Sequence, residues 1–370
     1  MDIPGASKLP PALDRLGVDA RAGMTFVKDN TGLAYGDGLL NKIKDSHEAV
    51  VSAVTYLLED IAKYPAEQGS AAVTLALHAY ESADRGAVTR LDDAGRAVFV
   101  DRTKFSGYYR MDGDPTSFTD AYEPQGRYKA TIADYNKADQ FQYAPALWDV
   151  ASPTSWMRDA IWGATELGAK MGIFDRAYDP FESWVKPLAG DWAGVRACAD
   201  VWDSIALALE DMSGNLRRHA LGVDGVWGGN AADALISHCW YNGEKILDVT
   251  TPMRGLAARY RESADAMFEI GKVMGSLIAD LCDAAMIFIS EASLAAATSE
   301  TIVGGVVFGG AAIYEGYKIW DIVKECLDLV GRADSLTSAL SSAGGDFGLI
   351  GDVGNLPILT GPLDLPIPAR

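Results

Sequence analysis

The stretch LGVDGVWGGNAADALISHCW (residues 221–240) decides the fold of this chain. Its turn, Trp227-Gly228-Gly229, lies between two segments whose apolar residues recur every three or four positions, which is the spacing of one helix face. Glycine permits a tight backbone turn that a Cβ atom would obstruct. Asn230 is the predicted N-cap of the following helix. The stretch therefore predicts two antiparallel helices joined by a short turn.

Long helices are predicted on both sides of this turn. Asp191 is the predicted N-cap of the first, which should end near residue 221. The second should run from residue 230 towards 248, break near Pro252 and resume to residue 297. One or two short helices are expected over residues 153–185. Residues 153–300 are therefore predicted to form one helical domain.

A second pair of helices is predicted nearer the N-terminus. Residues 1–35 contain three prolines and four glycines and are predicted to be an irregular arm. From residue 37 the apolar residues recur at helical spacing, and Tyr64-Pro65 interrupts them, because the residue before proline is disfavoured in the α conformation. Residues 36–96 are therefore predicted to form an antiparallel helical hairpin.

The remaining segments connect or extend these helices. Residues 97–152 are predicted to be a tyrosine-rich connector. Residues 301–340 should form a glycine-rich turn and a C-terminal helix, and residues 341–370 an extended tail. The whole pattern predicts an all-α fold, an elongated helical bundle built from antiparallel helical hairpins.

Composition limits the functional classes. The chain has 370 residues, 49% of them hydrophobic, which is enough for a sizeable folded core. Its formal charge of −19 opposes binding to nucleic acid and to anionic lipid. No Sec signal peptide is visible at the N-terminus. The most apolar stretch, residues 302–313, is too short to span a bilayer, so contact with a membrane is left open.

Recognisable catalytic and metal-binding motifs are missing from the sequence. The four histidines are scattered, and there is no phosphate-binding loop or nucleophile elbow. A calcium-loop spacing occurs at four acids, but Ser117 replaces the required glycine and Pro115 intrudes. The four acids are Asp112, Asp114, Asp120 and Glu123. We interpret them as an acidic turn, and we expect no enzyme activity, cofactor or metal.

Four cysteines, Cys198, Cys239, Cys282 and Cys326, form no metal-binding pair. Cys282 and Cys326 lie at equal distances from residue 304, so an antiparallel hairpin centred there would place them side by side and allow a disulfide. The alternative is two separate buried thiols.

Two motifs carry a resemblance to a known family. The Trp227-Gly228-Gly229 turn follows DPFESW (residues 179–184) and AGDW (residues 189–192), and this series resembles the WXG superfamily of type VII secretion substrates. Tyr80 and Asp84 are similar to the Y-x-x-x-D/E export signal of those substrates. Tyr317 and Asp321 fit the same spacing, but only Tyr80 comes late in a predicted N-terminal hairpin.

The order of the two motifs resembles the fused PE/PPE-like secreted proteins of actinobacteria. In those relatives the motifs meet to form one composite signal, which implies that Tyr80, Asp84, Trp227 and Gly229 cluster at one end of the bundle. The resemblance implies a structural, oligomerising or interaction protein without catalysis. It would be made in the cytoplasm and secreted, or held at the cell surface, through type VII secretion.

The same resemblance implies binding to the type VII secretion machinery or a chaperone, and lengthwise helix docking suggests a homo-oligomer. The alternative is the N-terminal delivery module of a secreted toxin system that lacks its own catalytic domain. A third class is a small-molecule enzyme on a helical scaffold.

Overall fold

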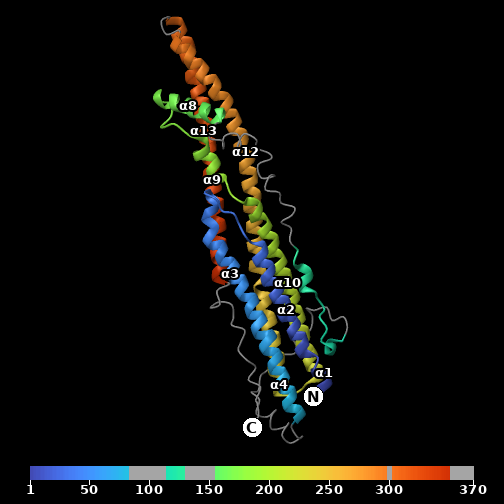
Figure 1. Ribbon diagram of the computed structural model, residues 1–370. Helices are drawn as coiled ribbons and strands as arrows, with labels where there is room; N and C mark the ends of the chain where they lie inside the picture. The colour runs from blue at the N-terminus through green and yellow to red at the C-terminus, as the bar shows by residue number, and fades with distance from the viewer. Residues whose placement is uncertain (83–113, 130–154, 298–301, 351–370) are drawn as a thin grey trace.

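The chain is all-helical in the parts that the computed structural model describes, which are residues 1–82, 114–129, 155–297 and 302–350. These ranges contain no β-strand, so the all-α prediction is confirmed for them. The long helices lie nearly parallel to one common axis, so the molecule has the shape of a rod (Figure 1). One continuous apolar core extends along it.

The N-terminal region is helical, so the predicted irregular arm over residues 1–35 is wrong. A short α1 (Ile3–Ala6) precedes the 22-residue α2 (Leu9–Asn30). Pro10 and Pro11 lie in the first turn of α2, where the backbone N–H groups need no partner within the helix. Gly23 permits close packing, since a Cβ atom there would lie 2.7 Å from Tyr128 Oη.

The second N-terminal helix is longer than predicted. It consists of η1 (Leu39–Ile43), α3 (Lys44–Ile61), the π-helical η2 (Ala62–Gln68) and α4 (Gly69–Ser82). The predicted break at Tyr64-Pro65 is wrong, because the wider π turn accommodates the ring and the missing N–H of Pro65.

The hairpin predicted over residues 36–96 is therefore a single helical run as far as Ser82, and its partner is α2. The two are antiparallel, since Leu13 approaches Gly69 whereas Gly23, later in α2, approaches Leu58. Residues 83–96 lie outside the described part of the chain.

The centre of the rod is formed by α10 (Trp192–Val226), α11 (Asn230–Asp248) and α12 (Thr250–Ala297). The Asp191 carboxylate accepts a hydrogen bond from the Gly194 N–H at 3.1 Å, so the predicted cap of α10 is confirmed. The helix continues past the predicted end near residue 221. Only Val249 separates α11 from α12, close to the predicted break at Pro252.

The last helix, α13 (Ile302–Ile350), returns along α12 and then packs on α3. The predicted glycine-rich turn is therefore wrong from residue 302 onward, and the predicted extended tail is wrong over residues 341–350. Leu340 and Phe347 are buried, and Gly344 lies against Ser46, so tertiary packing outweighs the low helix propensity of glycine and serine here. Residues 351–370 lie outside the described part of the chain.

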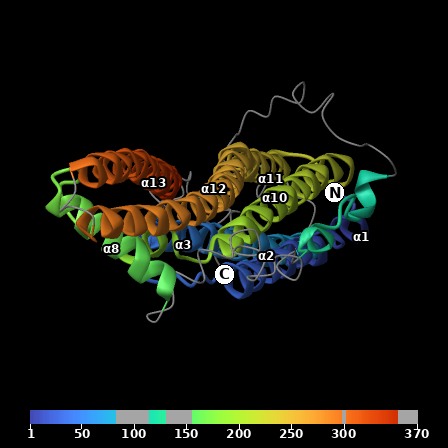
Figure 2. The same ribbon diagram turned by 90° about the horizontal axis from the view of Figure 1, so that it is seen from above.

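Short helices pack on the half of the rod that lies farther from the N-terminus (Figure 1). They are α8 (Trp156–Lys170), the π-helical η7 (Phe181–Val185) and α9 (Lys186–Leu188). The first two lie within residues 153–185, where one or two short helices were predicted, and α9 follows directly after that range. α8 packs across α12, and Phe174, just after α8, has its ring centroid 5.7 Å from that of Trp320 in α13. Seen from above, α2 and α3 lie together on one side of α10 and α12 (Figure 2).

Candidate functional site

The two sequence motifs meet at the end of the rod that holds the N-terminus (Figure 1). Tyr80, near the end of α4, and Trp227, the C-cap of α10, have ring centroids 5.6 Å apart with an interplanar angle of 85°. This edge-to-face arrangement is a favourable one for aromatic rings. The Trp227 side chain is only 3% exposed, whereas Tyr80 is half-buried. The contact predicted between these two residues is therefore present.

Gly229 sets the direction of the chain after Trp227. It lies at φ 101° and ψ −179°, a conformation that is essentially restricted to glycine. Gly229 is the N-cap of α11 and its carbonyl accepts from the Asp233 N–H at 3.0 Å. The predicted N-cap, Asn230, is instead the first helical residue, because the turn is completed one residue earlier. Asp84 lies outside the described residues.

The N-terminus closes this end of the molecule, which the sequence reading missed. The Asp2 N–H donates to the Val226 carbonyl at 2.7 Å, and α1 packs against both α10 and α4. A Cβ atom at Gly5 would lie 2.8 Å from Val226, so the close approach requires glycine. The Trp227 indole N–H is buried and makes no hydrogen bond within the described part of the chain.

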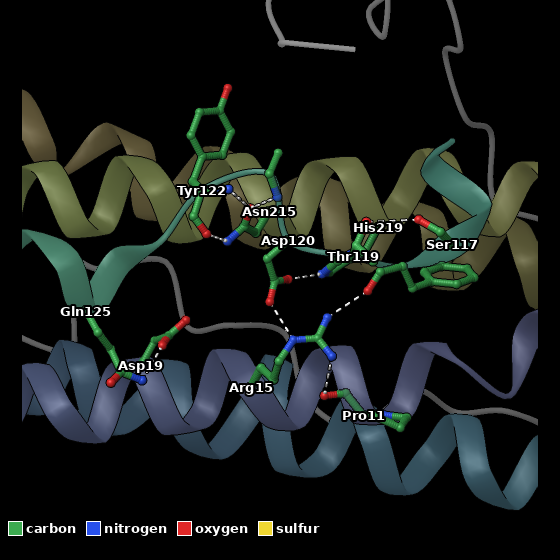
Figure 3. Close-up of polar contacts among 12 residues, drawn as sticks. Pro11, Arg15, Asp19, Ser117, Thr119, Asp120, Tyr122, Gln125, Asn215 and His219 are labelled. Carbon is green, nitrogen blue, oxygen red and sulfur yellow. Dashed lines mark hydrogen bonds and ion pairs between the residues drawn. The ribbon is translucent and has the colours of Figure 1, made fainter. Parts of the chain in front are cut away.

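A strap, residues 114–129, crosses from α10 to α2 beside this end. It contains two short 3-10 turns, η4 (Pro115–Ser117) and η5 (Pro124–Arg127). Asp120 lies between two basic side chains, accepting hydrogen bonds from Arg15 in α2 and from His219 Nε2 in α10 at 3.0 Å (Figure 3). Burial alone would raise the pKa of Asp120, but the hydrogen bonds from His219 and Arg15 hold it below its usual value.

Backbone contacts fix the strap in place as well. The Asn215 side-chain oxygen accepts from the N–H groups of Ala121 and Tyr122 at 2.9 and 3.0 Å, and its amide donates to the Tyr122 carbonyl at 3.0 Å (Figure 3). Arg127 pairs with Asp211 at 2.6 Å. The polar residues of α10 that hold the strap, Asp211, Asn215 and His219, lie on a largely buried stretch of that helix. Polar residues at buried helix positions are the one sequence signal that could have predicted a segment packed against α10.

The calcium-like spacing does not form a shared site among the described residues. The Asp114 carboxylate accepts from the Thr116 N–H and hydroxyl, and Asp120 is held by Arg15 and His219. Asp112 lies outside the described residues. Within those residues, no three His, Cys, Asp or Glu side chains lie close enough to hold a metal ion.

His47 lies in a buried polar and aromatic group at the centre of the rod. His47 Nε2 donates to the Thr31 carbonyl and Nδ1 accepts from the Tyr260 hydroxyl, both at 2.8 Å. His47, Tyr260 and the neighbouring Trp202 are buried, so this group links the end of α2 with α3, α10 and α12. Burial lowers the pKa of His47 and keeps the ring neutral.

Cys282 and Cys326 are free, buried thiols, so the possible disulfide is not formed. The hairpin of α12 and α13 is present, but its register differs from the prediction. A Cβ atom at Gly316 would lie 3.3 Å from the Phe288 ring, and the point halfway between residues 288 and 316 is residue 302 rather than 304. Cys282 then lies opposite residue 322, which is about one helical turn from Cys326.

Comparison with known proteins gives no match to a family model, to a curated protein or to a solved structure.

Proposed function

We propose that this protein is a substrate of a type VII secretion system and that it acts outside the cytoplasm as a structural or interaction protein, without catalysis. The contact between Tyr80 and Trp227 is the observation that carries the proposal. The two motifs are 147 residues apart, yet they come together in one aromatic pair, as the composite signal of fused PE/PPE-like proteins requires. An elongated bundle of PE/PPE-like and WXG-type hairpins is part of the same proposal.

The two aromatic residues have different roles in this proposal. Trp227 is buried and cannot itself present a large surface to a receptor. Its ring instead positions Tyr80, whose half-buried side chain remains partly accessible to the secretion machinery or a chaperone. Gly229 supplies the backbone turn that brings α11 away from the pair. Trp227 is therefore a positioning residue, and Tyr80 is the recognition residue.

Export of substituted chains in the native host tests this assignment. Tyr80→Ala should abolish export while leaving the helical circular dichroism and the melting temperature near wild type. Trp227→Phe keeps an aromatic ring beside Tyr80 and should retain part of the export. It is preferable to Trp227→Ala, since truncating a buried tryptophan costs about 3–5 kcal/mol of stability.

Two matched controls separate recognition from general damage. Tyr56→Ala removes an exposed tyrosine from α3, and Asp321→Ala removes the acid of the second Y-x-x-x-D match; both should be exported normally. Normal export of Tyr80→Ala would refute the proposed role. Equal loss of export in Tyr80→Ala and Tyr56→Ala would also refute it.

Homo-oligomer formation is a further part of the proposal, although Trp227 does not contribute to it. The indole is buried within its own chain and leaves no tryptophan-bearing tip for a neighbouring copy. Lengthwise docking of rods remains the basis for expecting an oligomer. The particle mass of the purified chain by light scattering tests it: a multiple of 39.5 kDa is expected, and a monomer at all concentrations would contradict it.

A further inference from the structure

A cleft with a volume of about 860 Å³ lies between α2 and the strap. Sites for small ligands have volumes of about 300–1,000 Å³, so the cleft has room for one. Apolar side chains line it from both sides, Pro11 and Val18 from α2 and Pro124 from the strap. Val18 is 51% exposed, which leaves apolar surface available to an occupant.

Asp19 is the buried charged residue of this cleft, and it is only 9% exposed. Its Oδ1 accepts a hydrogen bond from Gln125 Nε2 at 2.8 Å, and Figure 3 shows the other carboxylate oxygen pointing away from that amide. Among the described residues, Asp19 Oδ2 makes no hydrogen bond or ion pair. Burial raises the pKa of the Asp19 carboxyl, so a bound positive charge would stabilise its ionised form. A buried acceptor without a donor, beside a cavity, indicates a ligand that donates a hydrogen bond.

The basic residues of the cleft do not neutralise Asp19. Arg15 pairs with Asp120 of the strap. Lys8 lies 11 residues before Asp19, which corresponds to about 16 Å along the helix axis. Glu123 adds a second carboxylate that makes no ion pair within the described part of the chain. The cleft therefore favours a cation, and the formal charge of −19 attracts cations to the whole molecule.

The single unmatched oxygen selects the kind of cation. A guanidinium group pairs best with both oxygens of a carboxylate, but Gln125 already occupies Asp19 Oδ1. Calcium takes about six to eight oxygen ligands, and within the described residues no three His, Cys, Asp or Glu side chains lie close enough for a metal ion. One oxygen suits one N–H of an ammonium group. The apolar walls suit an aliphatic chain attached to that group.

We propose that the cleft binds an alkylammonium group, whose N–H donates to Asp19 Oδ2 while its aliphatic chain packs against Val18 and Pro124. A free diamine and the lysine side chain of another protein both offer this chemistry. The site does not depend on the contact between Tyr80 and Trp227. Failure of this proposal therefore leaves the export proposal unaffected, and the reverse is also true.

Calorimetric titration of the full chain at neutral pH and physiological salt tests the proposal. The probes are cadaverine, a free diamine, and Nα-acetyl-lysine amide, which represents a lysine side chain. The wild-type chain should bind at least one of them with a dissociation constant below about 1 mM. Tetramethylammonium carries the same type of charge without an N–H group, so it should bind at least about tenfold more weakly.

Two substitutions in α2 locate the site. Asp19→Asn keeps an oxygen that accepts from Gln125 but removes the charge, so it should weaken binding at least about tenfold. Asp14→Asn is the matched control, since it makes the same change of charge at an exposed position of the same helix that does not line the cleft. It should bind the probes like wild type. Circular dichroism should show the same helical content in both variants.

The pattern of binding identifies the source of the amine. Binding of cadaverine alone supports a free amine as the ligand, whereas binding of the lysine derivative supports a lysine side chain of another protein. Failure of both probes to bind the wild-type chain at about 1 mM would overturn the proposal. Equal affinities of Asp19→Asn and wild type would also overturn it. So would equal binding of tetramethylammonium and cadaverine, because it would show a general attraction of cations to the chain.

Discussion

Replacing Gly229 by alanine tests the backbone geometry on which the Tyr80–Trp227 end depends. Gly229 has φ 101° and ψ −179°, and residues other than glycine adopt this conformation only at a cost of about 1–3 kcal/mol. Any relaxation that relieved the strain would move α11 relative to Trp227. Gly229→Ala should therefore lower the free energy of unfolding by about 1–3 kcal/mol.

The preceding glycine provides the control. Gly228 does not have a positive φ, and a Cβ atom there would have no heavy atom within 4 Å. Gly228→Ala should be neutral or stabilise the protein by about 0.4–1 kcal/mol, because alanine restricts the unfolded chain. Urea unfolding followed by circular dichroism measures both variants against wild type, and an unchanged m-value would show that the midpoints report stability. Equal midpoints for the two variants would refute the assignment of strain to Gly229.

Three other predictions concern the strap, the histidines and the thiols. Asn215→Ala removes three hydrogen bonds to the strap and should lower the free energy of unfolding by about 2–3 kcal/mol. Proteolysis within residues 114–129 should become faster, and an unchanged rate of proteolysis would contradict the prediction. Burial lowers the pKa of His238 to about 4 in the folded chain. As the pH falls, this imidazole is therefore protonated in the unfolded chain before it is protonated in the folded chain. Stability should be constant above about pH 7.5 and should fall as the pH drops through 6.5, by about 2 kcal/mol between pH 7 and pH 5. This amount is the contribution of His238 alone, and His47, whose pKa burial also lowers, adds to the fall. His238→Gln should therefore reduce the fall by about 2 kcal/mol, and a pH-independent wild type would contradict the prediction. Burial raises the pKa of Cys239 and Cys326 to about 12, so native thiols should react with a disulfide reagent only after unfolding, and mass analysis should find no disulfide.

Local signals in the sequence predicted the structure best. The Asp191 cap and the start of α10 follow from a side chain that bonds three residues ahead. The break near Pro252 is local as well. The proximity of Tyr80 and Trp227 was different, because it came from the resemblance to secreted proteins and not from periodicity.

Proline and glycine misled the sequence reading where packing decided the outcome. Pro10 and Pro11 suggested an irregular arm, but they open α2. Pro65 suggested a turn, but a π-helical segment carries it within one long helical run. The glycine-rich stretch from residue 302 lies within α13. For α2 and for the helical run from residue 39 to residue 82, contacts with residues distant in sequence hold the helix, and a local pattern does not record them.

The strap was beyond prediction for the same reason. Asp120 contacts Arg15 and His219, which lie about 100 residues away in opposite directions along the chain. A carboxylate in an acidic turn gave no indication of either partner.

The most direct test of the central claim is the release of the intact chain from two strains of the native host, one with an active type VII secretion ATPase and one in which that ATPase is inactivated. The chain should accumulate in the culture medium or on the cell surface of the first strain and remain in the cytoplasm of the second. Equal release from both strains, with a cytoplasmic marker retained in the cells, would contradict the proposed function.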